Sequence, residues 1–375
     1  MRVVVAIDSF KGSLSSMEAG NAVKAAICRL NKEAEVLVKP LADGGEGTVE
    51  ALSSGLDSEM VEIYVNGPLM TPVKAKYCIL KNSNTAVIEM AAAAGLTLVP
   101  DDQRDPLKTT TYGVGELIKD AMDRGCRRFI VGIGGSATND GGTGMLSALG
   151  VQFLDKYDRP IALGAEGLEK LHRISTQNVI EQLKECAFYV ACDVKNPLCG
   201  DNGCSRIFAP QKGATAEMIE KMDVWLAHYA DLTKMVSDKA DCNCEGAGAA
   251  GGLGFAFLAY TNANLRSGID IVLEETKIEN DIMASDIVVT GEGRIDSQTV
   301  MGKAPIGIAK LAKKHGKKVI AFCGCTADGA EVCNEHGIDA FFPILRGVTT
   351  LEEALDKVNA YRNLSATVYQ VFRLI

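Results

Sequence analysis

Apolar residues in the first forty positions follow the pattern of a β-α-β unit. A β-branched run predicts a strand over residues 2–7, and the three- and four-residue spacing of apolar positions predicts a helix over residues 19–30. Ser15 followed three residues later by Glu18 predicts a capping box where this helix begins. A second short strand is expected over residues 35–39.

The C-terminal region repeats this alternation of strand and helix. Gly316 follows Lys313 and Lys314, an order that predicts a left-handed helix cap at this glycine. Such alternation requires a parallel sheet with helices on both faces. The expected strands are 285–290, 318–323 and 339–344, and the expected helices are 304–314, 328–335, one from Leu351 and one from Leu364.

The middle of the chain follows a different pattern. Strands within 61–90, broken by a turn at 66–68 and a polar loop at 81–85, predict antiparallel pairing. We therefore expect an α/β protein with a Rossmann-like parallel-sheet domain built from both chain ends, residues 1–64 and 282–375. A mixed α/β domain, residues 65–281, is inserted into it, with the active site in the cleft between the domains. A single boundary near residue 200 is the alternative, but it leaves each half with an incomplete sheet.

Composition narrows the classes of function. The 375 residues carry a net charge of −9, which argues against nucleic acid as a partner because phosphate binding needs a basic face. The amino terminus does not resemble a secretory signal and no apolar run approaches the ~20 residues that span a bilayer. We expect a cytoplasmic protein with no membrane partner, either monomer or homodimer, whose 12 cysteines stay as thiols. The two C-x-C pairs lack a nearby histidine that would complete a zinc pattern.

Two glycine-rich polar loops follow the first two predicted strands, and open α/β sheets bind ligands at the ends of their strands. Asp8, Ser9, Lys11 and Gly12 precede a helix, so their loop is a candidate anion site. The alternative is a plain loop that only caps the helix. The second loop, residues 41–48, carries two carboxylates among glycines and suits a metal or a hydroxyl ligand. Its alternative is a solvated turn into a helix at 48–53.

A third glycine-rich loop spans residues 132–144. Its Gly132-x-Gly134-x-x-Ala137 spacing is similar to a dinucleotide fingerprint, with Asp155 at about the right distance. The run continues with Asn139, Asp140 and further glycines, which prevents a helix from beginning where a pyrophosphate needs one. A nest of N–H groups that cradles phosphate is the preferred interpretation, and purely structural glycines are the alternative.

Two further loops end predicted strands. Asp193 ends an apolar strand just before a turn at 196–197. The segment 290–303 is similar to a P-loop, but eight residues separate Gly293 from Gly302, and Ala304 stands where Ser or Thr would hold magnesium. It is therefore not a Walker site.

Taken together, these loops place cations and carboxylates after strands, which is the combination that phosphoryl transfer requires. Asp193 is our expected general base, because its rigid strand end projects it; a turn-capping role is the alternative, with Asp296 and Asp140 as the next candidates for the base. The other expected roles are catalytic cations Lys11 and Arg294; substrate binding by Asp43, Glu46, Ser136, Asn139 and Lys195; ATP or phosphate binding by Ser9, Gly12, Gly291, Gly293 and Lys303; and metal binding by Asp8, Glu292 and Asp296.

The amino-acid sequences of these loops resemble those of the glycerate kinase type 1 family, the bacterial glycerate 2-kinases. The matching segments are DSFKGS at 8–13, PLADGGEGT at 40–48, GIGGSATNDGGTGML at 132–146, CDVKNPLCG at 192–200, GAAGGLGF at 248–255 and TGEGRIDSQTVMGKAP at 290–305. The resemblance implies a Rossmann-like domain with an inserted domain, and ATP and Mg²⁺ as co-substrate and metal. It also implies D-glycerate as acceptor and 2-phosphoglycerate, rather than the 3-phosphate, as product in glyoxylate or sugar-acid breakdown.

Two functions from other classes compete with this one. An NAD-dependent oxidoreductase acting on a small hydroxy acid is supported only by the fingerprint at 132–137. A non-catalytic anion-binding or regulatory protein would not need carboxylates beside its cations.

Overall fold

The computed structural model describes residues 1–45 and 47–375, and the chain forms two compact units. Unit 1 consists of Met1–Asp43, Glu50–Leu56 and Ser267–Ile375, and unit 2 of Gly44–Val49 and Asp57–Arg266. The divisions differ from the expected residues 64/65 and 281/282. The strand β3 (Ser58–Asn66) pairs into the sheet of unit 2, and α9 (Gly268–Thr276) and α10 (Ile278–Met283) contribute Ile269, Ile278 and Ile282 to a core of unit 1.

Unit 1 is built on a five-stranded sheet in the order β13-β12-β11-β1-β2, in which every neighbouring pair is parallel. The order reverses between β1 and β11, which is the switch point where doubly wound sheets bind ligands. The predicted Rossmann-like α/β class is therefore confirmed. The strands are β1 (Arg2–Val5), β2 (Glu35–Val38), β11 (Ile287–Ile295), β12 (Lys318–Thr326) and β13 (Ala340–Pro343).

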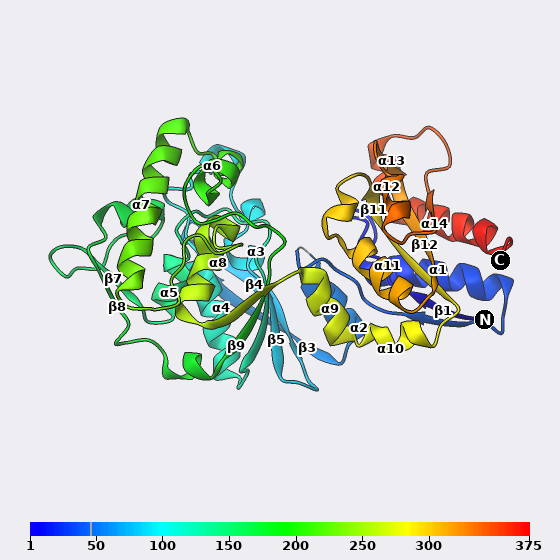
Figure 1. The fold of residues 1–375 in the computed structure, drawn as a ribbon, viewed down its shortest axis with the longest axis horizontal. Helices are drawn as coiled ribbons and strands as arrows, with labels where there is room; N and C mark the ends of the chain where they lie inside the picture. Colours follow the sequence, from blue (N-terminus) through cyan, green and yellow to red (C-terminus); the bar gives the residue numbers. More distant parts are fainter. Residues whose placement is uncertain (46) are drawn as a thin grey trace. The chain divides into compact units, whose positions relative to one another are not determined.

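Helices cover both faces of this sheet (Figure 1). Val3 and Val5 of β1 pack into a core with α1 (Ser16–Leu30) and α14 (Lys357–Phe372), while Val4 packs into a second core with α11 (Ala304–Lys314). Successive strand residues point to opposite faces, so an unbroken apolar strand serves both cores. The remaining helices in this part of the chain are α2 (Thr48–Gly55), α12 (Val332–Glu335), α13 (Leu351–Leu355) and the 3₁₀ turn η6 (Thr299–Met301).

Local sequence signals predicted several helix ends correctly. The capping box of Ser15 and Glu18 is present at the start of α1, and Gly316 has a φ of 65° just after α11. Two expectations were wrong: α14 begins at Lys357 rather than near 364, because the Asp356 side chain caps it, and α12 is shorter than 328–335.

Unit 2 contains a six-stranded mixed sheet in the order β10-β9-β6-β5-β4-β3. Its strands β3, β4 and β5 pair antiparallel, as predicted, and β5, β6, β9 and β10 pair parallel. Strands are β4 (Pro72–Leu80), β5 (Thr85–Glu89), β6 (Arg128–Gly132), β9 (Ala187–Ala191), β10 (Asn262–Arg266) and a separate pair, β7 (Gln152–Leu154) and β8 (Arg173–Ser175). Helices are α3 (Ala91–Ala94), α4 (Tyr112–Asp123), α5 (Thr143–Ala148), α6 (Cys204–Phe208), α7 (Ala216–Lys234), α8 (Ala249–Tyr260) and the 3₁₀ turns η1 (Leu96–Leu98), η2 (Asp101–Gln103), η3 (Ala165–Lys170), η4 (Glu181–Glu185) and η5 (Pro210–Lys212).

Two glycine-rich segments of unit 2 pack backbone against backbone. The N–H of Gly141 donates to the carbonyl of Gly251 over 2.9 Å, and a Cβ on Gly251 would lie 2.1 Å from the Thr138 carbonyl oxygen. Gly251 also has a φ of +65°, which side chains disfavour. The glycines at 248–254 therefore allow close approach to the loop between β6 and α5.

The described residues form no helix that is both long and apolar enough to cross a membrane. All twelve cysteines are free thiols, as expected.

Candidate active site

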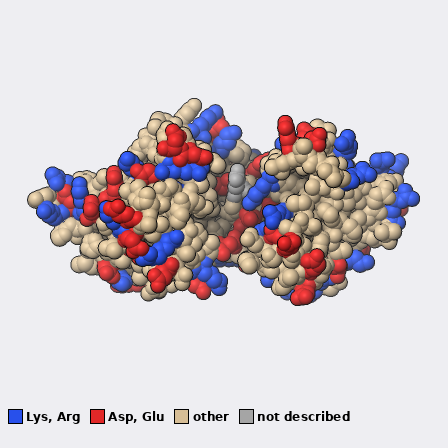
Figure 2. Space-filling view, turned by 90° about the horizontal axis from the view of Figure 1, so that it is seen from above, with Lys and Arg blue, Asp and Glu red and all other residues tan. Residues whose placement is uncertain are grey.

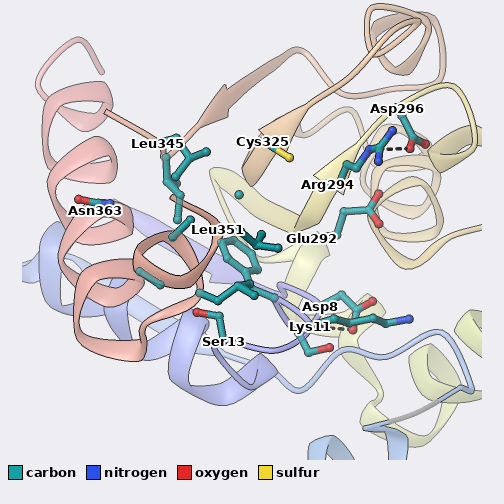
Figure 3. A pocket seen from close by; sticks show the side chains of 18 of the residues that line it. Asp8, Lys11, Ser13, Glu292, Arg294, Asp296, Cys325, Leu345, Leu351 and Asn363 are labelled. Atoms are coloured by element: carbon teal, nitrogen blue, oxygen red, sulfur yellow. Dashed lines mark hydrogen bonds and ion pairs between the residues drawn. The ribbon is translucent and has the colours of Figure 1, made fainter. Parts of the chain in front are cut away.

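A cavity of about 350 Å³ lies in unit 1 at the point where the strand order reverses. Its polar side is formed by the loop after β1 and by the end of β11, and its other side by the segment after β13 and by α13 and α14. Figure 3 shows Leu345, Leu351 and Asn363 across the cavity from Asp8, Glu292 and Arg294.

The loop after β1 brings a carboxylate and a lysine to the cavity. The N–H of Asp8 donates to the Gly291 carbonyl over 2.9 Å, so the loop continues the register of β1 with β11. The Asp8 side chain is 7% exposed and its Oδ1 accepts the N–H of Ser9 over 2.7 Å. Gly12, with a φ of +78°, turns the chain toward α1 and leaves Lys11 exposed at the cavity.

The end of β11 supplies the remaining charges. Glu292 Oε1 accepts the Thr299 hydroxyl over 2.7 Å, and its Oε2 pairs with Lys303 Nζ at 3.2 Å. Arg294 Nε pairs with Asp296 Oδ2 at 3.2 Å. β11 extends past its predicted end at 290, because Gly291 allows it to pass β12: a Cβ there would lie 1.9 Å from the Phe322 carbonyl oxygen.

Burial shifts the titration of two of these carboxyls. It raises the pKa of Asp8 to about 7, and the nearby carboxylate of Asp43 adds to this rise, while the Ser9 N–H and the Lys11 charge oppose it. Burial also raises the pKa of Glu292, against the hydrogen bond from Thr299 and the charge of Lys303. The site therefore holds a carboxyl that changes charge near neutral pH.

The ligand-free protein should lose stability of unit 1 as the pH rises from about 4 to 8. The pKa of Asp8 is raised from 3.8 to about 7 on folding, so the folded state binds more protons in that range and its stability falls with rising pH. The upper limit is on the order of 4 kcal/mol. Asp8→Asn should flatten this dependence. Urea unfolding followed by circular dichroism measures it, with Trp225 fluorescence separating the transition of unit 2.

An equally steep pH dependence in Asp8→Asn would contradict this assignment. Asp286→Asn is the matched control, because Asp286 belongs to unit 1 and does not line the cavity.

An apolar wall faces these charges, and the sequence analysis did not identify it. Ile344 and Leu345 follow β13, and Leu351 and Leu355 come from α13. Leu351 is 74% exposed, so it is not a core residue, and such a position is ordinary at the edge of a ligand site. The available signal was the capping box at Thr350 and Glu353, which predicts a short helix here. None of the residues of this helix is buried, so its leucines do not belong to a core.

The structure thus brings together most of the expected site residues of unit 1. The cavity is lined by Asp8, Ser9, Lys11, Asp43, Glu292, Gly293, Arg294, Asp296 and Lys303, with Gly12 and Gly291 in the same loops. Within residues 1–45 and 47–375, no three carboxylate, histidine or cysteine side chains are grouped closely enough to hold a metal ion alone. Glu46 lies outside the described residues.

The other expected residues belong to unit 2, at the carboxyl ends of β6 and β9. Asp193 follows β9 and is exposed, as is Lys195, whose Nζ pairs with Glu245 at 3.2 Å. Ser136 and Asn139 follow β6 and are buried. The amide of Asn139 donates to the Ser205 hydroxyl over 2.9 Å, so its substrate-binding role stays a prediction.

A buried lysine supports the loop that carries Ser136. Lys212 is 1% exposed, and its ammonium donates to Ser136 Oγ over 2.7 Å and to the Thr138 carbonyl over 2.6 Å. Burial lowers the pKa of Lys212 to about 8, and the nearby Cys204 and Asp140 oppose the shift. No pattern in the neighbouring residues predicts that this lysine is internal.

Asp140 also has its partners inside the protein. Its carboxylate accepts the N–H groups of Gly142 and Gly144 and the N–H and hydroxyl of Thr111. The expected phosphate-cradling nest is therefore at least partly occupied by a carboxylate of the same loop. The helix that follows, α5, begins only at Thr143, as expected, so the dinucleotide fingerprint is not formed at 132–137.

Comparisons with known proteins agree along the whole chain. A family model described as the glycerate kinase family matches residues 3–375. The chain is 45% identical to a glycerate kinase of Haemophilus influenzae, covering 100% of this chain and 99% of that protein. It is 46% identical to a glycerate 2-kinase of Escherichia coli, covering 98% of each. A solved structure from Salmonella typhimurium LT2, described as glycerate kinase 2, is 46% identical and superimposes with a TM-score of 0.91 over 99% of this chain and 97% of that one.

Proposed function

Because the chain belongs to the glycerate kinase family and is a kinase, we propose that it transfers the terminal phosphoryl group of ATP to D-glycerate. We propose Mg²⁺ as the metal and 2-phosphoglycerate as the product, with 3-phosphoglycerate as the alternative product. The comparisons give no support to the oxidoreductase alternative.

One observation carries the ATP proposal: the cavity of unit 1 combines an apolar wall with a set of cations and carboxylates at the switch point of a doubly wound sheet. An adenine ring needs an apolar surface, and phosphates need cations and N–H donors. The cavity offers both on opposite sides (Figure 3).

We assign the nucleotide base to the wall of Ile344, Leu345, Leu351 and Leu355, and the phosphates to the opposite side. Lys11, Arg294 and Lys303 then neutralise phosphoryl oxygens, whose charge the transition state spreads over three positions. Lys303 is also the N-cap of α11, so the dipole of that helix acts in the same direction. In this assignment the phosphates lie against the loops that contain Ser9, Gly12, Gly291 and Gly293.

The carboxylates on this side have the oxygen ligands that Mg²⁺ prefers. Asp8, Glu292 and Asp296 are the proposed ligands, and one or two of them suffice because Mg²⁺ is commonly completed by phosphate oxygens and water. When bound, the metal supplies charge neutralisation of the phosphates.

For the acceptor, we propose Asp193 as the general base that accepts the proton of the glycerate hydroxyl. It lies two residues after the end of β9, and it is exposed. Lys195 is the proposed contact of the glycerate carboxylate, and Asp43, Ser136 and Asn139 are the other proposed contacts.

A coupled assay of ADP release tests the activity. We expect ADP formation that requires both D-glycerate and Mg²⁺, and ³¹P NMR of the product distinguishes the 2-phosphate from the 3-phosphate. Absence of glycerate-dependent ADP release, with a change in nicotinamide absorbance when NAD and a hydroxy acid are supplied, would overturn the proposal in favour of the oxidoreductase.

Lys303→Met should raise the KM for ATP by roughly 10–100-fold. A hydrogen bond to a charged group contributes about 1.5–3 kcal/mol, and the methionine keeps the length of the side chain without its charge. Initial-rate kinetics at varied ATP measure the change. Lys310→Met, on the exposed face of α11 and away from the cavity, is the control, and an equal KM in both variants would contradict the assignment.

A further inference from the structure

A second cavity of unit 1, with a volume of about 550 Å³, lies against α1, α14 and the segment after β13. We call it the arginine cavity because Arg29, Arg346 and Arg362 line it. Tyr361 and Tyr369 are also in its lining, and no aspartate or glutamate is. A cavity with several cations and no acid is unexpected in a protein whose net charge is −9.

The three guanidinium groups have no ion-pair partner within residues 1–45 and 47–375. Arg29 stacks on the ring of Tyr369, 4.9 Å from its centroid, and Arg362 Nη2 donates to Asn359 Oδ1 over 3.0 Å. These partners hold two of the groups in place but leave their charges uncompensated. Other arginines pair with acids, for example Arg124 with Asp120 and Arg159 with Asp155.

The surrounding helices add no compensating charge at this end of the unit. α14 contains Lys357 and Arg362 but no aspartate or glutamate, and the only acid within α1, Glu18, pairs with Lys357. Figure 2 shows Lys and Arg side chains gathered at the end of unit 1 where α14 finishes. Like charges held together repel each other, and an anion bound among them would relieve that repulsion.

The arginine cavity shares a wall with the candidate active site. Ile344 and Leu345 line the active-site cavity and the next residue, Arg346, lines the arginine cavity. On α14, Ala360 and Asn363 face the first cavity, whereas Tyr361 and Arg362 face the second. Consecutive positions on a helix point in different directions, so one helix separates the two cavities.

We propose that the arginine cavity is a binding site for a small phosphorylated metabolite, distinct from the proposed nucleotide site. Guanidinium forks match phosphate oxygens in geometry and remain charged at every physiological pH. The volume suits a small molecule rather than a polymer segment. The shared wall places this ligand directly behind the residues assigned to the nucleotide base.

Equilibrium dialysis with inorganic phosphate as the probe, at low ionic strength, tests this site without any kinase assay. The test variant is Arg29→Gln/Arg346→Gln/Arg362→Gln, and the matched control is Lys24→Gln/Lys310→Gln/Arg373→Gln, three cations of unit 1 that do not line the cavity. Lys11→Gln/Lys303→Gln removes cations of the other cavity, so phosphate bound there is identified separately.

We expect the arginine variant to lose one phosphate site per chain, or to bind it at least 10-fold more weakly, with the control unchanged. An unchanged thermal midpoint shows that the variant is folded; if the triple variant unfolds, the single variant Arg346→Gln replaces it, with a weakening of at least threefold expected. Phosphate binding equal to that of the wild-type protein overturns the proposal. So does binding to phosphatidylglycerol vesicles that free phosphate does not reproduce, because the site would then recognise a membrane.

Discussion

Asp140→Asn is expected to lower the free energy of unfolding of unit 2 by about 3–5 kcal/mol, because each buried donor left without an acceptor costs about 1–3 kcal/mol. One oxygen of Asp140, Oδ2, accepts four hydrogen bonds of 2.8–3.2 Å, from the N–H groups of Thr111 and Gly144 and from the hydroxyls of Thr110 and Thr111. The other oxygen accepts the N–H of Gly142 over 3.0 Å. An asparagine amide in either orientation sets an NH₂ group against a backbone donor, so donors inside the protein lose their partner.

The single tryptophan, Trp225 in α7, makes this measurement specific to unit 2. Urea unfolding followed by its fluorescence gives the stability of the unit that contains Asp140. Asp231→Asn is the control, because Asp231 lies on the same helix as Trp225 in an exposed ion pair with Lys234 and should cost no more than ~1 kcal/mol. A loss for Asp140→Asn as small as the control's would show that the network does not hold the loop.

Asp193→Asn is expected to lower kcat by roughly 10²–10⁴ while leaving the KM for ATP and the unfolding midpoint nearly unchanged. This expectation rests on the proposed role of Asp193 as general base. Asparagine keeps the size of the side chain but cannot accept a proton, and an exposed residue in the loop after β9 contributes little to folding.

Initial rates at saturating ATP and glycerate measure this effect. Asp201→Asn is the control, since Asp201 is fully exposed in the same region of unit 2. A variant of Asp193 that retains more than about a tenth of the wild-type kcat would transfer the role to another carboxylate. The two substitutions should therefore have different effects. Asp140→Asn should change the stability of unit 2, and Asp193→Asn should change turnover.

Much of unit 1 was predictable because its signals are local. Alternation of apolar strands with helical spacing predicted a parallel sheet, and loops after two strands were expected to meet at one sheet edge. The pairing of β1 with β11 did bring Lys11 and Arg294 to one cavity. The length of β11 was underestimated, because a glycine usually weakens a strand and here Gly291 permits one to continue.

The parts that were not predictable depend on burial, which a residue's identity does not encode. Asp140 and Asp193 both follow strands in glycine-rich or polar loops, yet one is fully buried and the other exposed. Lys212 is the only buried lysine in the described part of the chain, and nothing around it in the sequence distinguishes it from the exposed lysines. The apolar wall was missed for a similar reason, since leucines such as Leu351 normally indicate a core.

The central position of β1 in the sheet of unit 1 has a consequence for synthesis on the ribosome. β1 lies between β2 and β11, with Val3 opposite Ile287 of β11. The edge of β1 that faces β11 therefore stays unpaired until residues 287–295 have been synthesised. At about 5–20 residues per second, that interval is on the order of 15–60 s. The described strands of unit 2 that form its large sheet all end by Arg266, so that sheet is complete in sequence while β1 still exposes an unpaired edge. The nascent chain therefore carries in β1 an apolar, β-branched segment that must wait for its partner β11, and during that interval its open edge needs protection from pairing with other chains.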